Sequence, residues 1–422
     1  MTTPHPTRPP EPLGDGLTLR SAEPDDIEAV VALEVAAFGA SDEPGVRAHL
    51  TAPGALGDWT VVTAGDRVVS ASGLLAHRMA LDGVGFAGGQ IEYVATDPDF
   101  QRRGLVRAQF DWHHRRAAGR GDLALFIGGI PYLYRRFGYG YGLDYPAVRA
   151  PGPLAPPADP DLVIRPALAA DGPAIRALDA TRPTSGLRVV RDAAAWRVID
   201  AICDGNQWER LWVAARPSRG PEAIVGWFRT QATPEDGRDY LPAAAVAPDE
   251  PAATTLAMVA RARALADADA LIVWDVADSA FSARVGQLDE LGPPLQHDHG
   301  IYVRVPDPIA LLDALRPVLS ERFAASRHAG RDSELVLSFY DSAAVLVLEG
   351  GQVTGVHAAP GIEDPFGVGG VGIAPDWFGA LVFGRFGAAG LEARADDVTL
   401  GRARSLMDAL FPKRPSDVVG EF

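Results

Sequence analysis

Residues 89–142 read GQIEYVATDPDFQRRGLVRAQFDWHHRRAAGRGDLALFIGGIPYLYRRFGYGYG, and this stretch decides the fold. Its beginning, Ile91–Ala95, is apolar and partly β-branched, which predicts a strand. Thr96-Asp97-Pro98-Asp99 ends that strand, because proline and aspartate favour turns. The pattern then predicts a helix over residues 101–118, a second strand at Ala124–Ile127 and an aromatic loop.

The turn before the predicted helix is suited to an anion. N–H groups at the start of a helix have no partner inside it, and their dipoles favour negative charge. Gly104 lets the backbone approach a ligand closely, and Arg102 and Arg103 supply cations that match phosphate oxygens. A solvated basic surface is the alternative interpretation.

Two motifs carry a resemblance to a known family. The segment Val94-Ala95-Thr96-Asp97-Pro98, followed by Gln101-Arg102-Arg103-Gly104-Leu105-Val106, resembles the acetyl-coenzyme A signature of the GNAT acetyltransferases. That signature is usually Q/R-x-x-G-x-G/A, so Val106 departs from it at the last position. The later Tyr134-Arg135-Arg136-Phe137-Gly138-Tyr139-Gly140 is similar to the Y-x-R-F-G-Y-G segment of the Eis (enhanced intracellular survival) branch. The resemblance covers residues 17–422.

Size and composition indicate a multidomain globular protein. A chain of 422 residues is too long for one core, and 47% hydrophobic with 22% charged residues is ordinary for globular proteins. No apolar run reaches membrane-spanning length. Residues 1–16 are proline-rich without the apolar stretch of a signal peptide, which predicts a disordered leader. The single cysteine excludes an intrachain disulfide and argues against structural zinc, so we expect a cytoplasmic protein without a metal.

The net charge of −16 limits the partners that this chain can bind. Nucleic acid is disfavoured, because phosphate binding needs a basic surface. A cationic, amine-bearing small molecule is favoured, because the overall field attracts it.

The chain contains an internal repeat. After a proline-rich linker at residues 150–160, Leu162–Ala167 matches Leu17–Ala22, and in the same register Asp171 falls on Asp26. We therefore expect two copies of one fold, at residues 17–150 and 161–305. Strands are predicted in the second copy at 208–214, 223–229, 243–247 and 271–276, with a strand at 302–305 closing the domain.

The second copy lacks the anion-binding turn. Pro248-Asp249-Glu250 stands where the first copy has its arginines, and these acids would repel a pyrophosphate. This domain is therefore predicted to be non-catalytic.

Residues 306–422 form a third unit. We predict a helix at 308–323, antiparallel strands at 334–339, 344–349 and 353–358 with a turn at Gly350-Gly351, and helices at 374–383 and 398–410. This layout resembles the sterol-carrier-like third domain of Eis-type proteins. The expected fold class is mixed α+β: tandem GNAT folds, the second degenerate, followed by a sterol-carrier-like α+β domain.

Acetyl transfer to an amine needs a base for the ammonium and an acid for the departing thiolate. The resemblance implies that Tyr134 is the general acid. Tyr132 competes for this role, because the segment before the motif is longer than in the family. The tyrosines of this loop could instead form an aromatic wall.

Two carboxylates are candidates for the base. Glu92 shares one face of the central strand with Gln90 and Val94, where many GNAT enzymes place a carboxylate that works through water. In the Eis branch the C-terminal carboxylate serves instead, which here implies that of Phe422. A frayed terminus is the alternative for Phe422.

The resemblance also implies a set of cofactor contacts. The main chain of Val94, Ala95 and Thr96 would pair with the pantetheine arm. The pyrophosphate would be held by the turn and the first helical residues, namely Arg102, Arg103, Gly104, Leu105, Val106 and Arg107. Phe126 and Ile127 match positions that flank the cofactor.

Other reactive side chains have a structural interpretation. His113 and His114 have no cysteine or carboxylate at ligand spacing, so we expect them to pack or to lie at the surface. Cys203 lies in the degenerate copy and is expected to be a small buried hydrophobe.

The predicted function is an acetyl-CoA-dependent N-acetyltransferase that works through a ternary complex. The resemblance implies aminoglycoside- or polyamine-like acceptors and a homo-oligomer, hexameric in family members. One alternative is a biosynthetic acyltransferase that uses another acyl-CoA or a specific metabolite acceptor. The other is a non-enzymatic CoA- or lipid-binding protein.

Overall fold

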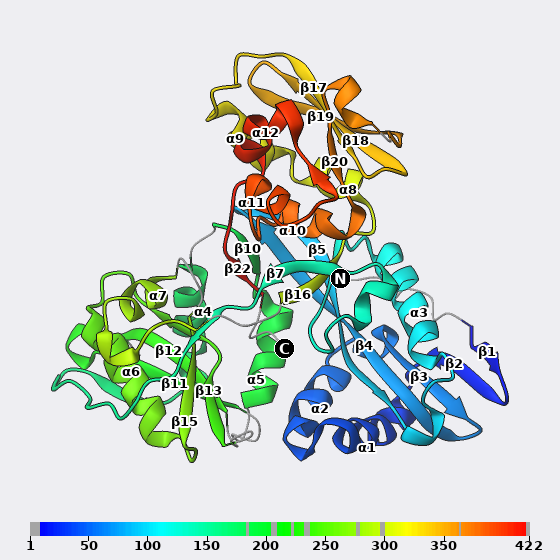
Figure 1. The fold of residues 1–422 in the computed structure, drawn as a ribbon. Coiled ribbons are helices and arrows are strands. Elements are labelled where there is room, and N and C mark those ends of the chain that lie inside the picture. The colour runs from blue at the N-terminus through cyan, green and yellow to red at the C-terminus, as the bar shows by residue number, and fades with distance from the viewer. Residues whose placement is uncertain are drawn as a thin grey trace.

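The computed structural model of this chain describes residues 9–182, 185–203, 209–220, 223–231, 237–275, 279–295, 300–362 and 364–418. Its three lobes follow one another from blue to red in Figure 1. Each lobe combines helices with β-sheet, which confirms the predicted mixed α+β class. No helix in the described part of the chain is long and apolar enough to cross a membrane.

The first lobe is built on one large sheet. Its strands are β1 Glu11–Gly14, β2 Leu17–Ser21, β3 Trp59–Ala64, β4 Arg67–Leu81, β5 Val84–Thr96, β6 Ala124–Ile127, β7 Gly140–Asp144 and β16 Gly300–Arg304. They lie in the order β1-β2-β3-β4-β5-β6-β16-β7. Side chains alternate between the faces of a strand, so Val61 packs with helices α1 (Ile27–Phe38) and α2 (Glu43–Thr51) while Val62 packs with α3 (Leu105–Arg120).

The start of the described chain corrects one prediction. Residues 1–16 were expected to be a disordered leader, but Glu11–Gly14 forms β1 and pairs antiparallel with β2. A hairpin turn at Asp15-Gly16, both with positive φ, joins the two strands. Hydrogen bonds to the edge strand β2 order this segment, and the local sequence gives no sign of that pairing.

Strands cross between the first two lobes. The strand predicted to close the second domain is β16, and it pairs with β6 and β7 of the first sheet. Conversely, β8 (Ala147–Arg149) leaves the first lobe and pairs with β15 (Ala270–Asp275) of the second. The strand predicted at residues 302–305 is thus present, but its assignment to the second domain was wrong, because the open edges of the two sheets, not chain order, select the partner.

The second lobe contains the other strands predicted for the repeat. They are β9 Val163–Pro166, β11 Glu209–Ala215, β12 Ile224–Gln231, β14 Ala244–Val246 and β15, and the lobe also has β13 Arg238–Leu241, which was not predicted. Its helices are α4 Gly172–Ala180, α5 Ala193–Cys203, α6 Ala252–Leu265 and α7 Ala280–Val285. β11 and β12 form the expected antiparallel hairpin.

One ion pair is repeated in both copies in the register that the sequence predicts. Arg20 binds both carboxylate oxygens of Asp26 at 2.6 and 2.8 Å, and Arg165 binds those of Asp171 at the same two distances. Each aspartate also accepts a backbone N–H three residues upstream, at 2.8 and 2.7 Å. The pair thus connects the first strand of each copy to its first helix, and the duplication is structural.

We expect Asp26→Ala to destabilise the first lobe by about 2 kcal/mol, the cost of removing charged hydrogen bonds from a buried group. Asp26 is only 7% exposed, so Arg20 and the Glu23 N–H would lose their partner where little water can replace it. The midpoint of urea unfolding measures this change. Asp25→Ala, at an exposed neighbouring position, is the control and should leave the midpoint unchanged.

The third lobe has a sheet in the order β19-β18-β17-β20-β21. Its strands are β17 Ser333–Ser338, β18 Ser342–Glu349, β19 Gln352–Pro360, β20 Val371–Ile373 and β21 Val398–Thr399. Its helices are α8 Pro308–Ala314, α9 Arg316–Ala324, α10 Phe378–Val382, α11 Ala388–Glu392 and α12 Arg404–Leu410. The turn at Gly350-Gly351 is confirmed, with positive φ at both residues as a tight hairpin requires.

Two helix predictions in this lobe need correction. The helix expected over 308–323 divides at Leu315 into α8 and α9, because Pro317 has no N–H to continue the hydrogen-bond ladder. The segment expected as a helix over 398–410 begins instead as β21, and only Arg404–Leu410 is α-helical.

The end of the described chain returns to the first lobe. Strand β22 (Ser416–Asp417) runs parallel to β10 (Leu187–Val189), and β10 pairs antiparallel with residues 79–81 of β4. Figure 1 shows β10 and β22 at the junction of the lobes. Val418 is 1% exposed and belongs to the core shared by the first and third lobes.

Candidate active site

The central strands of the first lobe separate at one end. β5 and β6 are parallel and pair only from Gly88 to Gln90, opposite Ala124 to Phe126. Beyond Gln90, β5 continues to Thr96 with β4 on one side and no strand partner on the β6 side within the described chain. The edge of β5 there offers backbone N–H and C=O groups to a ligand.

A bulge in β5 lies at this opening. The register against β4 shifts between Ala71 and Gly73, and Tyr93 has φ +55°. A bulge re-aims the side chains around it, and Glu92 comes directly before it. Val94, Ala95 and Thr96, the predicted pantetheine contacts, follow on the same unpaired edge.

Glu92 is a carboxyl group with an altered acidity. Burial raises the pKa of Glu92 to about 7, against a smaller opposing effect of the hydrogen bond from the Gln90 side chain. The nearby charge of Asp42 raises it further. A carboxyl with a pKa near neutrality exchanges protons efficiently at physiological pH.

Glu34 of α1 adds a second buried carboxyl to this region. It is 0% exposed, and neither of its oxygens has a hydrogen-bond partner among the described residues. Burial, then the charges of Asp42 and Glu92, hold the pKa of Glu34 well above its usual range. The three acidic groups therefore lie close enough to interact.

The turn between β5 and α3 carries exposed arginines and a glycine with positive φ, but the helix begins later than expected. Arg102 and Gly104 have φ +62° and +80°, values that a right-handed helix excludes, so α3 starts at Leu105 rather than at residue 101. Gly104 provides no capping side chain, and the first turn contains no acidic residue. The N–H groups at this end are thus available to an anion.

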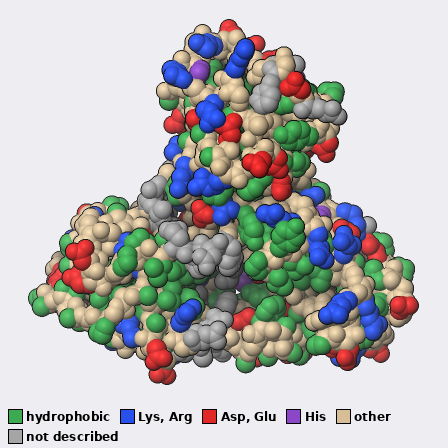
Figure 2. Space-filling model, viewed as in Figure 1, with side chains coloured by type: hydrophobic (Ala, Val, Ile, Leu, Met, Phe, Trp, Pro, Cys, Tyr) green, Lys and Arg blue, Asp and Glu red, His purple; other side chains and the backbone are tan. Residues whose placement is uncertain are grey.

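Exposed arginines surround that helix start. Arg102, Arg103 and Arg107 are exposed, and Figure 2 shows Lys and Arg side chains gathered over α3. Arg103 is anchored by the Asp99 carbonyl at 3.0 Å and by the Phe100 ring, and Arg107 lies over Phe137. The side chains of Leu105 and Val106 pack inward instead.

The aromatic loop brings Tyr134 to the opening. Its ring stacks on Phe110 of α3, with centroids 5.9 Å apart, and meets Tyr302 of β16 edge to face at 5.4 Å. Burial, then the charge of Glu92, raise the pKa of Tyr134 to about 12, so the phenol keeps its proton at neutral pH. Tyr134 is 6% exposed, whereas the competing Tyr132 is 73% exposed.

The two residues at the end of β6 face opposite ways. The side chain of Phe126 packs toward Phe383 of the third lobe, with ring centroids 6.1 Å apart. That of Ile127 lies in the cluster of Phe110 and Tyr134. Only Ile127 therefore directs its side chain to the α3 side of the opening.

Sequence reasoning missed Tyr145 and Tyr302. A Cβ on Gly128 would stand 2.8 Å from the Tyr145 hydroxyl, and one on Gly129 would stand 3.2 Å from that of Tyr134. Burial, followed by the charge of Glu92, raises the pKa of Tyr145. The Gly128-Gly129 pair could have indicated phenol groups packed against the backbone here, since two glycines leave room for both. No sequence feature indicated Tyr302, because it comes from a distant segment.

The remaining reactive side chains have structural roles, as expected. His113 is 0% exposed and its Nε2 lies 2.8 Å from Ser72 Oγ; burial lowers its pKa to about 3. His114 Nε2 lies 3.1 Å from the Tyr139 hydroxyl. Cys203 packs against the core of the second lobe. No group of His, Cys, Asp or Glu in the described ranges could hold a metal ion. Phe422 lies outside the described residues.

Comparison with known proteins agrees with this geometry. Residues 18–142 match the family model described as acetyltransferase (GNAT) domain. None of the curated proteins compared matches the sequence. Among solved structures, a conserved protein of unknown function from Enterococcus faecalis V583, a probable N-acyltransferase, has a TM-score of 0.70 at 11% identity, over 96% of this chain and 100% of its own.

Two further structures cover most of the chain. Eis1 from Mycobacterium abscessus has a TM-score of 0.59 at 16% identity, over 94% of this chain and 97% of its own. N-myristoyltransferase from Saccharomyces cerevisiae, with bound myristoyl-CoA, has a TM-score of 0.52 at 13% identity, over 72% of this chain and 81% of its own. At these identities the likeness establishes a shared fold. Residues 18–142 therefore match a GNAT acetyltransferase domain, and the fold of the chain is that of tandem GNAT-like domains with an additional α+β domain.

Proposed function

We propose that this protein transfers an acetyl group from acetyl-CoA to an amine of a cationic small molecule, such as an aminoglycoside or a polyamine, in a ternary complex. One observation carries the proposal: Glu92, with a pKa near 7, and Tyr134, with a pKa near 12, interact electrostatically at the opening between β5 and β6. A carboxyl group with a pKa near neutrality, beside a phenol that keeps its proton, is suited to removing one proton and supplying another.

The donor would bind along the unpaired edge of β5 and at the start of α3. Val94, Ala95 and Thr96 offer backbone groups to the pantetheine amides, and the α3 N-terminus with Arg102 and Arg103 suits the pyrophosphate. The bound myristoyl-CoA of the yeast N-myristoyltransferase supports a CoA thioester as the donor for this fold.

In the reaction, the base takes a proton from the acceptor ammonium, and the neutral amine attacks the thioester carbonyl. The carbon–sulfur bond then breaks as the tetrahedral intermediate collapses. The Tyr134 hydroxyl gives its proton to the leaving sulfur, so that CoA departs as the thiol, and the resulting phenolate takes the second proton that the attacking nitrogen loses as the amide forms. No covalent enzyme intermediate is needed when both substrates are bound together.

Two carboxylates remain candidates for the base. Glu92 is supported by its position and by its pKa of about 7. The Phe422 carboxylate is supported by the Eis resemblance and by the direction of β22. This strand runs parallel to β10, and β10 runs antiparallel to β4, so the chain advances there toward the lower-numbered residues of β4. In that direction β4 pairs with Gln90 and then with Glu92. We take Glu92 as the base and the chain end as the alternative.

The charge around Glu92 supports a cationic acceptor. Burial and the charge of Asp42 raise the pKa of both Glu34 and Glu92, and the charge of Glu92 raises that of Glu34 further. An ammonium group between them would relieve that repulsion.

The other domains would have supporting roles. In the second copy, residues 161–305, the buried Glu250 carboxylate accepts two hydrogen bonds from Arg216, at 2.9 and 3.1 Å, just before α6. An internal anion there supports a non-catalytic copy, because the corresponding place in the first copy would hold the pyrophosphate. We further propose a sterol-carrier-like role for residues 306–422, a cytoplasmic location and a homo-oligomer, on the Eis resemblance.

A thiol-release assay tests the function directly. Acetyl-CoA is supplied with aminoglycosides and polyamines, and acetyl-CoA binding is measured in parallel by calorimetry. Turnover with one or more amines supports the proposal. Binding of acetyl-CoA without turnover across the panel contradicts an amine acetyltransferase and favours another acceptor class, and absence of binding contradicts the donor site.

We expect Arg102→Gln to raise KM for acetyl-CoA about tenfold with little change in kcat. The substitution removes a cation that contacts the phosphates of the donor but not the reacting atoms, and one charged hydrogen bond accounts for this factor. Arg115→Gln, which changes an arginine within α3 that pairs with Glu11 at 3.2 Å, is the control and should leave KM unchanged. Equal KM values for Arg102→Gln and the original chain would remove Arg102 from the donor site.

The pH profile gives a further prediction. With Glu92 as base, kcat/KM should rise about tenfold per pH unit below pH 7 and level off above it, because only the ionised carboxylate accepts a proton. Glu92→Gln should abolish this inflection. An inflection that persists in the variant would belong to another group.

A further inference from the structure

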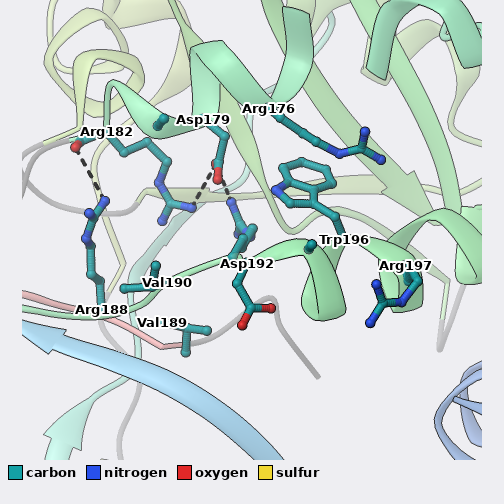
Figure 3. A pocket seen from close by; sticks show the side chains of 12 residues that line it. Arg176, Asp179, Arg182, Arg188, Val189, Val190, Asp192, Trp196 and Arg197 are labelled. Atoms are coloured by element: carbon teal, nitrogen blue, oxygen red, sulfur yellow. Dashed lines mark hydrogen bonds and ion pairs between the residues drawn. The ribbon is translucent and has the colours of Figure 1, made fainter. Parts of the chain in front are cut away.

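A cavity of about 510 Å³ lies at the junction of the first two lobes, and none of its lining residues belongs to the opening between β5 and β6. It is formed by α4, β10, α5 and the segment between the last two. Its volume is in the range of small-molecule sites. Figure 3 shows its lining, which is dominated by arginine side chains: Arg176, Arg182, Arg188, Arg191 and Arg197.

The charge of this lining is opposite to that of the chain. The lining has five arginines against two acids, Asp179 and Asp192, in a protein of net charge −16. Such a concentration of like charge costs free energy unless anions compensate it. The two aspartates can neutralise only part of the positive charge of the five arginines.

Part of the charge is neutralised internally. Asp179 accepts from Arg191 at 2.6 Å and from Arg182 at 3.2 Å, and Arg182 also pairs with Asp417 of β22. Arg191 is almost fully buried, with its side chain 2% exposed. These two arginines belong to the structural network that joins α4, β10 and β22.

The other arginines are less satisfied. Arg176 pairs with Asp200 at 2.7 Å on the exposed side of α4 and α5. The buried Nε of Arg188 has no hydrogen-bond partner in the described part of the chain, and its Nη1 reaches only the Arg182 carbonyl, at 3.5 Å. Arg197 is exposed and forms no ion pair or hydrogen bond with any described residue.

The helix terminus beside the cavity is already occupied. The Asp192 side chain accepts the N–H groups of Ala194 and Ala195 at 2.8 and 3.0 Å. A ligand would therefore be held by guanidinium groups and not by the amides of α5. Guanidinium binds carboxylate and phosphate with two parallel hydrogen bonds.

We propose that the cavity between α4, β10 and α5 binds a small organic anion with at least two carboxylate or phosphate groups. Arg188 comes from β10 and Arg197 from α5, and the two stand at opposite sides of the view in Figure 3. A ligand with two anionic groups can pair one group with each guanidinium. The site is separate from the acyl-transfer site and does not depend on the function proposed for it.

Calorimetric titration of the full chain with citrate, at low ionic strength and saturating acetyl-CoA, tests this proposal. We expect one citrate per chain, binding tighter than acetate and weakening as salt is added. Arg197→Gln should weaken citrate about tenfold or more, through loss of one charged hydrogen-bonding group. Because Arg197 is exposed and unpaired among the described residues, this variant should fold.

Two controls keep the test specific. Arg402→Gln, an exposed arginine of the third lobe, removes the same charge elsewhere and should leave citrate binding unchanged. Absence of citrate binding overturns the proposal. So do an equal loss in the Arg402 variant, which would indicate a general charge effect, and displacement of citrate by acetyl-CoA, which would assign the anion to the donor site.

Discussion

Replacing Tyr134 with phenylalanine should lower kcat for acetyl transfer by about 100- to 10,000-fold, the range that a general acid contributes. The substitution removes only the hydroxyl, so the ring can keep its stacking on Phe110 and its edge contact with Tyr302. Binding of acetyl-CoA should therefore be unchanged. Thiol release measures the loss, and calorimetry with acetyl-CoA measures the retained binding.

Two matched variants identify the hydroxyl that matters. Tyr132→Phe, at a position 73% exposed, should leave turnover unchanged. Tyr145→Phe alters the other phenol beside the double glycine and should have a smaller effect than Tyr134→Phe. Full turnover in the Tyr134 variant, with loss in the Tyr145 variant, would transfer the acid role to Tyr145.

Replacing Glu92 with glutamine should lower kcat/KM at neutral pH by about 100-fold or more, because the amide cannot accept the ammonium proton. The amide has nearly the same shape as the carboxyl, so the strand and its bulge should be preserved. Thermal unfolding should show no loss of stability, since the variant removes a buried group that ionises at a cost.

A chain lacking Glu421 and Phe422 is the decisive comparison for the base. If Glu92 is the base, this shortened chain keeps most of its turnover while Glu92→Gln loses it. The reverse pattern, with acetyl-CoA binding retained in both, would contradict the role of Glu92 and favour the chain end. Loss in both would indicate that the two carboxylates act on the same acceptor.

The local sequence was sufficient for features that depend on near neighbours. The repeated strand and helix predicted that Asp171 corresponds to Asp26, and the Arg20–Asp26 and Arg165–Asp171 ion pairs follow this register because their partners are only six positions apart. The turn around Gly104 was likewise visible, since proline, glycine and arginine at fixed positions act through backbone conformation and charge. The exact start of α3 was not, because positive φ at Arg102 is set by its surroundings.

Distant pairing explains what the sequence did not reveal. β16 joins the first sheet although it lies far along the chain: its Tyr302 accepts a hydrogen bond from the amide of Tyr132, 170 residues earlier. No local periodicity of the sequence encodes such a distant partner. The division of residues 308–323 at Leu315, by contrast, could have been read from Pro317.

The sequence by itself predicted the repeated architecture, the turn around Gly104 and the residues that we propose as acid and base, because these depend on residue types at short spacing. Only the tertiary structure decided how those groups behave. Burial and the nearby charge of Asp42 bring the pKa of Glu92 to about 7, and burial, followed by the charge of Glu92, raises that of Tyr134 to about 12. Desolvation and charge proximity depend on which segments meet in space, and chain order does not specify that.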